Sequence, residues 1–325
     1  MSPPAWKNGS SPPPESGFAL VVVIVILLLA GFLASQMALA VRTELRLATN
    51  VKERAAGRLL AEAGIEFGLF RLLDKPLTLA MDETEFRLVL ARPYTEPLTT
   101  GEVTYRVINE TGKIDLNRVP QRLLELFLEF HGLAPEQIDT VVDSLYDWRD
   151  PDNLHRLNGA EQDYYEGLED PYIPRNGRIA EPAEFFLIKG TEPLIDRFAA
   201  EDVFTVHSAT NRINFFSLTP AMLEFVMEGD ASRIEAYEAA LLDDERPLDQ
   251  ARAQELMGEE RFGLLRPYLT FSAGSCKYYT ITATARMGER QEGAETDRRP
   301  ATTVSVLVSH SGGRPPYLAW RQSAS

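Results

Sequence analysis

An uninterrupted apolar stretch near the N-terminus constrains this chain more than any other feature. Residues 17–41 contain no charged side chain, and the polar leader before them carries only Lys7 and Glu15 as charged side chains. About 20 consecutive apolar residues are enough for one helix to cross a hydrocarbon core roughly 30 Å thick. The sequence therefore predicts a leader at residues 1–17 and a single transmembrane helix at residues 18–41.

Three interpretations fit this stretch: a secretory signal peptide, a plain N-terminal anchor, or a segment that is processed at its edge. Ala38-Leu39-Ala40 resembles the small-residue cleavage site of a signal peptide. The uncharged run is longer than the apolar region of a usual signal peptide, however, and the helical pattern continues beyond it. The Gly17-Phe18 step at the start of the run favours the third interpretation.

The helical pattern extends well past the membrane segment. Apolar residues recur at spacings of three and four, with Glu62 as the polar exception. No proline occurs between residue 15 and Pro76, so a helix from about Phe18 to Leu73 would be about 80 Å long at 1.5 Å per residue. The apolar stripe consists of Val41, Leu45, Ala48, Val51, Ala55, Leu59, Ile65, Leu69 and Leu72.

The rest of the chain predicts a small sheet whose sequence is interrupted by helices. Strand-like runs occur at residues 86–91 and 102–109, and again at 279–285 and 303–309. Between these pairs the chain shows helix and loop patterns. We therefore predict an α+β fold, in which the long N-terminal helix packs on a small antiparallel sheet that is interrupted by a large α-helical inserted domain. The predicted boundaries are 42–111 and 271–325 for the helix-and-sheet domain and 112–270 for the insert.

The insert contains a weak internal repeat. An extended Ile-[Asp/Asn]-[Leu/Phe] piece, followed by a helix that starts near a proline, occurs at residues 112–124 and again at 211–223. A third helix–turn element lies at residues 184–195, and such elements resemble helix-hairpin-helix or SAM-like domains. Some of these bind DNA phosphate through a glycine-rich hairpin, but here Glu192 puts an acid in the hairpin. We interpret the elements as packing units.

Composition argues against nucleic acid as a partner and against catalysis. The formal net charge is −15, whereas affinity for a phosphate backbone depends on Lys and Arg. A divalent cation matches this charge better. The single cysteine, Cys276, cannot form an internal disulfide. The four histidines lie far apart in the sequence, and no nucleophile elbow, zinc-protease motif or phosphate-binding glycine loop occurs, so we predict that the chain is not an enzyme.

An acidic loop in the middle of the insert is the candidate metal site. Clustered carboxylates suit Ca²⁺, which takes about six to eight oxygen ligands. The spacing is not that of an EF-hand, because Leu154 stands where a third polar ligand belongs. The alternative is a turn whose side chains cap neighbouring backbone groups, with solvated acids nearby. The candidate ligands are Asp150, Asp152, Glu161, Asp163 and Asp170.

Four short motifs in the insert carry a family resemblance. They are D-W-x-D-x-D at residues 147–152, G-A-E-x-x-Y-Y at 159–165, P-Y-x-x-x-N-G at 171–177 and Glu-Phe at 184–185. In this succession they resemble the general secretion pathway protein K family of type II secretion systems. The polar leader, Gly17, Phe18 and the apolar helix are similar to the processing signal of type IV pilins and pseudopilins, so the resemblance covers nearly the whole chain.

One position departs from the usual pilin pattern. In most pilins and pseudopilins the fifth mature residue is a glutamate, whose charge pairs with the N-terminal amine of a neighbouring subunit. Counted from Phe18, the fifth residue here is Val22. A subunit with Val22 cannot offer this pairing, and its absence is typical of the protein K family, whose members are thought to occupy the pilus tip.

The resemblance implies a minor pseudopilin that primes assembly of the secretion pseudopilus, occupies its tip and supports protein export across the outer membrane. It implies cleavage after Gly17 by prepilin peptidase, methylation of Phe18, and calcium in the helical domain. The implied location is the inner membrane, with a single pass and the C-terminal body in the periplasm. The flanking charges do not define this orientation, because Lys7 is the only basic residue before the span, whereas several Arg and Lys residues follow it.

The implied partners are the I- and J-type minor pseudopilins, the major pseudopilin, prepilin peptidase, secreted substrate proteins and the outer-membrane secretin. Two alternative functions are a minor type IV pilin of a surface pilus or competence system and a membrane-anchored helix-hairpin-helix receptor for DNA.

Overall fold

The structure is a computed structural model that describes residues 16–73, 88–243, 245–271, 276–288, 300–309 and 317–324. The chain divides into two compact units, Met1–Ala56 and Gly57–Ser325, and helix α1 (Ser16–Leu73) contributes residues to both. Most of the predicted leader lies outside the described residues.

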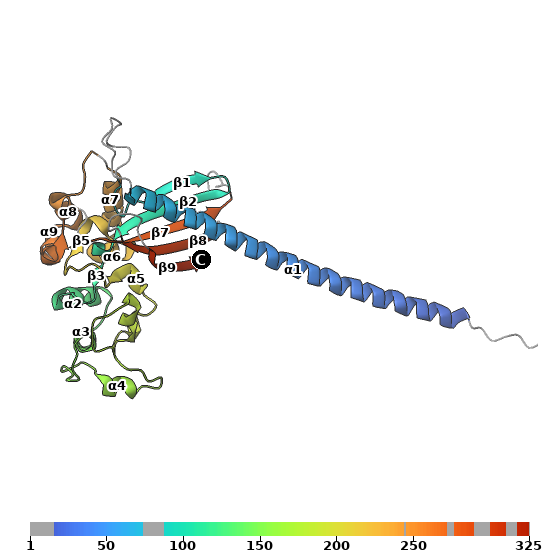
Figure 1. Ribbon diagram of the computed structural model, residues 1–325, viewed down its shortest axis with the longest axis horizontal. Helices are drawn as coiled ribbons and strands as arrows, with labels where there is room; N and C mark the ends of the chain where they lie inside the picture. Colours follow the sequence, from blue (N-terminus) through green and yellow to red (C-terminus); the bar gives the residue numbers. More distant parts are fainter. Residues whose placement is uncertain are drawn as a thin grey trace, which may run out of the picture. The chain divides into compact units, whose positions relative to one another are not determined.

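The first unit contains the N-terminal part of α1, which confirms the long apolar helix (Figure 1). Among the described residues, α1 is the one helix long and apolar enough to cross a membrane. Its apolar side chains are exposed, as for Leu28 at 68% and Leu33 at 66%. Exposing this much apolar surface to water is unfavourable, so the segment has the properties of a single-pass membrane anchor.

The second unit contains a five-stranded antiparallel sheet (Figure 1). Strand β2 lies beside β7 in the sheet although the whole insert separates them in sequence, which confirms the interrupted sheet. In spatial order the strands are β1 (Tyr94–Leu98), β2 (Gly101–Asn109), β7 (Tyr278–Met287), β8 (Ala301–Ser309) and β9 (Tyr317–Ala324).

The first and last strands differ from the sequence prediction. The strand predicted at residues 86–91 is wrong where the chain is described, because residues 88–91 form a coil and a turn; residues 86 and 87 lie outside the described residues. The Ala91 N–H still donates to the Val107 carbonyl at 2.9 Å. Strand β9 was not predicted; it pairs antiparallel with β8, the strand that precedes it in the sequence.

Glycines set the distance between α1 and the sheet. Within the second unit, α1 buries Leu60, Ala61, Ile65 and Leu69 against the apolar face of β2, β7 and β8. A Cβ atom at Gly64 would lie 2.4 Å from Val103 Cγ2, and one at Gly68 would lie 2.6 Å from Ile281 Cγ2. The predicted stripe is correct at Ile65 and Leu69 but wrong at Leu59, which is 66% exposed, because close approach selects the glycine-bearing side of the helix.

The insert has its own hydrophobic core. Its longest helices, α2 (Gln121–Phe130) and α3 (Pro135–Arg149), form a helical hairpin whose turn uses Gly132 at φ +76°. The shorter α-helices are α4 (Gln162–Glu166), α5 (Ala200–Val203), α6 (Pro220–Val226), α7 (Ala231–Leu242), α8 (Gln250–Met257) and α9 (Glu259–Leu265). The 3₁₀ helices are η1 (Glu110–Gly112), η2 (Pro182–Leu187), η3 (Glu192–Leu194), η4 (Phe215–Ser217) and η5 (Arg266–Tyr268).

The internal repeat has a structural counterpart. Its two extended pieces form the two-residue strands β3 (Ile114–Asp115) and β5 (Ile213–Asn214). Each pairs in parallel with a strand later in the chain, β3 with β4 (Phe204–Thr205) and β5 with β6 (Leu269–Thr270). The third element, predicted at residues 184–195, forms η2 and η3. The repeats therefore act as packing units within one core.

Buried polar groups join the sheet to the insert at the end of β2. The Asn109 N–H donates to Ser217 Oγ at 2.7 Å. The Glu110 carboxylate accepts from Lys113 Nζ at 2.6 Å, from Thr205 Oγ1 at 2.6 Å and from Thr280 Oγ1 at 2.7 Å. Burial by itself raises the pKa of Glu110, but Lys113 and the hydrogen bonds outweigh it and hold the pKa below its ordinary value.

We predict that Gly64→Ala lowers the free energy of unfolding of the full-length chain in detergent by about 1–3 kcal/mol, because the new methyl group overlaps Val103. Denaturant unfolding followed by circular dichroism measures this change. Gly263→Ala in α9 is the matched control, since no atom lies within 4 Å of its new Cβ, and it is expected to be stabilising by up to about 1 kcal/mol. Equal effects of the two substitutions would contradict the close-approach argument.

Candidate metal centre

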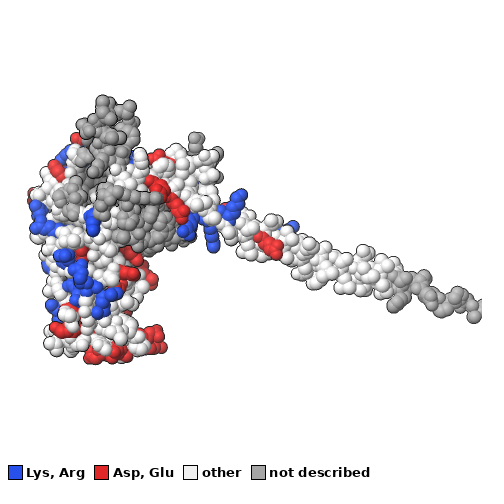
Figure 2. Space-filling view, viewed as in Figure 1, with Lys and Arg blue, Asp and Glu red and all other residues white. Residues whose placement is uncertain are grey.

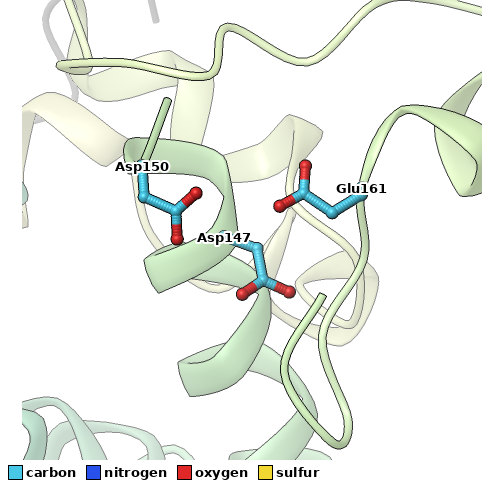
Figure 3. A group of neighbouring side chains, drawn as sticks. All are labelled: Asp147, Asp150 and Glu161. Atoms are coloured by element: carbon cyan, nitrogen blue, oxygen red, sulfur yellow. The ribbon is translucent and has the colours of Figure 1, made fainter. Parts of the chain in front are cut away.

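Three carboxylates converge where α3 ends and α4 begins. One oxygen from each of Asp147, Asp150 and Glu161 lies within 4.8 Å of the others. Figure 3 shows the Asp150 and Glu161 carboxylates pointing toward one another, with Asp147 beside them. Asp147 lies in the last turn of α3, Asp150 is its C-cap and Glu161 is the N-cap of α4.

The local sequence explains this convergence. Asp150 has extended backbone angles (φ −84°, ψ 160°) and precedes a proline, which disfavours helical geometry at this residue and ends α3. The returning chain passes very close to Asp147: a Cβ atom at Gly159 would lie 1.8 Å from Asp147 Oδ2. The Arg156 N–H also donates to Asp147 Oδ2 at 3.0 Å. Glycine at 159 thus allows the loop to bring Glu161 against the end of α3.

Glu161 is the least satisfied carboxylate of the three. It is 2% exposed, and neither of its oxygens has a hydrogen-bond partner among the residues that the structure describes. Burial, together with repulsion from Asp147, Asp150, Asp152 and Asp163, raises the pKa of Glu161 to about 7. Burial also raises the pKa of Asp147. A buried carboxylate without donors is costly unless a cation compensates it.

The donor set fits a hard divalent cation. Carboxylate oxygens are the ligands that Ca²⁺ and Mg²⁺ prefer, and Ca²⁺ tolerates irregular geometry. The side chain of Asn176 adds a further oxygen. Its Nδ2 donates to the Asp152 carbonyl at 3.2 Å and to Asn153 Oδ1 at 2.8 Å. Its own Oδ1 is buried and has no partner within the described part of the chain. Buried oxygen atoms of Glu161 and Asn176 are therefore left without a hydrogen-bond donor from the described residues.

The other predicted ligands lie outside this group of three. Asp152 is exposed, and its Oδ1 accepts the Leu154 N–H at 2.8 Å, so it caps the turn as in the alternative interpretation. Asp163 in the first turn of α4 and Asp170 in the following loop are exposed. Figure 2 shows acidic side chains gathered over this end of the insert. These acids add negative potential without joining the cluster.

Asp147 was not among the predicted ligands, although it opens the D-W-x-D-x-D motif. Its spacing of three from Asp150 places both side chains on one side of the helix end, which is the signal that the sequence offered.

The processing residues lie at the start of α1. Gly17 and Phe18 belong to its first turn. Val22 lies in the apolar part of the helix and is 40% exposed.

We predict that, with metal chelated, the chain loses stability as the pH rises from 4.5 to about 7. Over this range folded Glu161 keeps a proton that the unfolded chain has already lost, so the extra stability present below pH 4.5 disappears as the pH reaches the folded pKa. Thermal unfolding at several pH values in EDTA measures the slope.

Glu161→Gln should flatten that slope, whereas Glu136→Gln, at an exposed position, controls for the change in charge alone. A slope that is the same in wild type and Glu161→Gln would contradict the assignment.

Comparison with known proteins shows which proteins the chain resembles. The family model of type II secretion system protein K matches residues 108–197, which contain the three converging carboxylates. A curated type II secretion system protein K from Pectobacterium carotovorum subsp. carotovorum is 25% identical over 138 residues. That alignment covers 38% of this chain and 42% of the relative, which is less than half of the relative's length.

The fold also has a solved counterpart. A chain in the crystal structure of the GspK-GspI-GspJ complex from the enterotoxigenic Escherichia coli type 2 secretion system matches with a TM-score of 0.52 and 17% identity. The match covers 86% of this chain and 99% of that chain, and at this identity it establishes the fold. The matched domain and the curated relative make this chain similar to the type II secretion system protein K family, and the solved structure shows that it shares their fold.

Proposed function

We propose that this chain is a non-catalytic minor pseudopilin that primes assembly of a type II secretion pseudopilus and occupies its tip. The observation that carries this proposal is the protein K domain inserted between β2 and β7 of a pilin-like helix-and-sheet unit. A subunit within the shaft must present equivalent surfaces above and below, and a large insert with its own core is difficult to repeat in that way.

Val22 supports the same position. A charged amine buried among apolar helices is costly unless an opposite charge lies nearby. Val22 gives a neighbouring subunit no such charge, so this chain fits best where no subunit follows above it. The alternatives of a surface-pilus pilin and a DNA receptor lack a comparable observation, since the matched domain belongs to a secretion family.

The proposed partners are I- and J-type minor pseudopilins, with the major pseudopilin below them. The structural neighbour is a GspK-GspI-GspJ complex, which makes such an assembly the first to test. Helix α1 also has exposed apolar side chains beyond the predicted span, with Leu45 at 62%, Leu47 at 59% and Val51 at 66%. Such side chains gain stability when they pack on a partner helix.

The proposed location is the inner membrane, with the body in the periplasm and prepilin peptidase acting at Gly17-Phe18. From the filament tip, the insert would meet secreted proteins and the outer-membrane secretin. These contacts support export without any chemical step.

We also propose that Asp147, Asp150 and Glu161 hold Ca²⁺. When bound, the ion supplies positive charge to three crowded carboxylates. The chain's own contribution is to carry these ligands on the end of α3 and the start of α4, so that binding ties the two elements together. The unpartnered oxygens of Glu161 are the main support for this site.

Ca²⁺ is expected to raise the melting temperature of the full-length chain, and EDTA should reverse the change. At a Ca²⁺ concentration 100 times the dissociation constant, binding adds about 2.7 kcal/mol to the free energy of unfolding. Asp147→Asn and Glu161→Gln should abolish most of the shift, as measured by differential scanning fluorimetry.

Asp163→Asn and Asp170→Asn are the matched controls, because they remove equal charge from exposed positions outside the cluster. An unchanged melting temperature on adding Ca²⁺ or EDTA would refute the site. Loss of the shift only in the control variants would move the site to the residues predicted from sequence.

Purification from cells that also express the I- and J-type pseudopilins and prepilin peptidase tests the pseudopilin role. We expect a three-component complex in which this chain begins at methylated Phe18, as read by intact-mass spectrometry. Gly17→Leu, which blocks the cleavage step, serves as the control. In this variant the leader should remain attached to the chain. A mature start near Val41 would support a signal peptide instead, and failure to co-purify would argue against the tip complex.

A further inference from the structure

The insert presents two leucines and an isoleucine to solvent on two loops beside the candidate metal centre. Leu157 is 93% exposed, Leu154 80% and Ile173 71%, so they are the three most exposed large apolar side chains among the residues that the structure describes. Single exposed apolar residues are common on protein surfaces, whereas a group of them on adjoining loops is a candidate interaction site. We call the loops at residues 150–161 and 168–178, with these three side chains, the loop surface.

Hydrogen bonds fasten the second loop to the first. Asn176 Nδ2 donates to Asn153 Oδ1 at 2.8 Å, one residue before Leu154 in the chain. The Gly177 N–H donates to the Trp148 carbonyl at 3.2 Å, which attaches the same loop to the end of α3. The two loops therefore form one surface of the insert.

The backbone on both sides of Leu157 is anchored to α3. The Arg156 N–H donates to Asp147 Oδ2 at 3.0 Å, and the Asn158 N–H donates to Asp143 Oδ2 at 3.1 Å. Both acceptors belong to α3. Turning Leu157 toward the core would break these bonds, so the fold itself holds this side chain in solvent.

Ile173 is held outward in a similar way. The Tyr172 hydroxyl donates to the Leu187 carbonyl at 2.6 Å, and the Tyr172 ring packs against the core of the insert. Pro174, on the other side of Ile173, is buried. A side chain that is already fixed in position loses little conformational freedom when a partner covers it, and this favours binding.

The loop surface is acidic. Residues 150–178 contain seven acids and three bases, so their formal charge is 3 − 7 = −4. Two of the three bases already have acidic partners, since Arg156 Nε lies 3.8 Å from Asp147 Oδ1 and Arg175 Nε lies 2.6 Å from Glu184 Oε2. These two bases therefore offset little of the remaining negative charge.

Three carboxylates of the loop surface and the adjoining α4 are uncompensated. Asp163, Glu169 and Asp170 are exposed, and their carboxylates have neither a hydrogen bond nor an ion pair with any residue in the described part of the chain. Acidic side chains are visible at this end of the insert in Figure 2. Free carboxylates beside exposed apolar side chains match a protein surface that carries Lys or Arg, and they repel an anionic lipid surface.

We propose that the loop surface docks a partner protein through an apolar contact ringed by Lys or Arg side chains of that partner. The three apolar side chains supply the centre of the contact, and the three free carboxylates supply its charged rim. The inference depends on these two loops and not on the tip position or on bound calcium, so its test can fail while the proposed function stands.

A randomised heptapeptide library displayed on phage and panned against the full-length chain in lipid nanodiscs, with Ca²⁺ in the buffer throughout, tests the proposal. The library is first depleted on the Leu154→Ser/Leu157→Ser variant, which removes peptides that bind elsewhere. Peptides enriched afterwards on the wild type are expected to combine an aromatic or aliphatic side chain with Lys or Arg.

Fluorescence anisotropy with the best synthetic peptide then measures the affinity of variants that played no part in the selection. Ile173→Ser, on the second loop, should weaken binding at least fivefold, and Glu169→Gln/Asp170→Asn should weaken it at least threefold. Thermal unfolding confirms that each variant is folded; if one of them unfolds, the other still decides.

Two double variants are the matched controls, and each should change the affinity less than twofold. Leu242→Ser/Leu264→Ser removes exposed leucines from α7 and α9, and Glu136→Gln/Glu235→Gln removes two charges from exposed positions outside the loop surface.

The proposal is overturned if no peptide survives the depletion, if the enriched peptides lack basic residues, or if affinity persists in the folded Ile173→Ser or Glu169→Gln/Asp170→Asn chain. Flotation of the nanodiscs with added phosphatidylglycerol vesicles, lost in the Leu154→Ser/Leu157→Ser variant, would assign the loop surface to a membrane and would overturn it too.

Discussion

The buried ion pair between Glu110 and Lys113 holds the second unit of this protein together at the point where β2 leaves the sheet. Removing a carboxylate from water is costly, and here the cost is offset by one ammonium and two hydroxyl donors that come from three different parts of the chain. Thr205 belongs to the insert and Thr280 to β7, so the same carboxylate bonds both sides of the junction. This junction therefore joins the insert directly to the sheet.

Two buried glutamates in the second unit differ in how their carboxylates are satisfied. Glu110 is 3% exposed and its carboxylate has three donors, which hold its pKa low. Glu161 is 2% exposed, has acids for neighbours and has a raised pKa. The first carboxylate is satisfied by the protein itself. The second requires a proton or a cation, which is why it carries the calcium proposal.

Helix α1 combines two environments in one element. Its N-terminal part has the apolar surface of a membrane anchor, whereas beyond Gly57 it packs against a sheet through glycine and small residues. Glycine is unfavourable in a helix interior, by about 1 kcal/mol relative to alanine. At Gly64 and Gly68 this cost is accepted because any larger residue would displace the helix from β2 and β7.

Local patterns in the sequence were enough to predict the long helix, three of the five strands and the interruption of the sheet. They also revealed the motifs that resemble the protein K family. Helix and strand periods and short motifs can be recognised without knowledge of distant contacts. Only the tertiary structure decided which acids converge. Asp150 and Glu161 were expected together, but Asp147 joins them and Asp152 does not, since the approach of Gly159 to α3 sets the geometry. The glycine face of α1 also depends on residues far apart in the chain, because Gly64 and Gly68 approach Val103 and Ile281, and contacts of that kind leave little trace in any single segment.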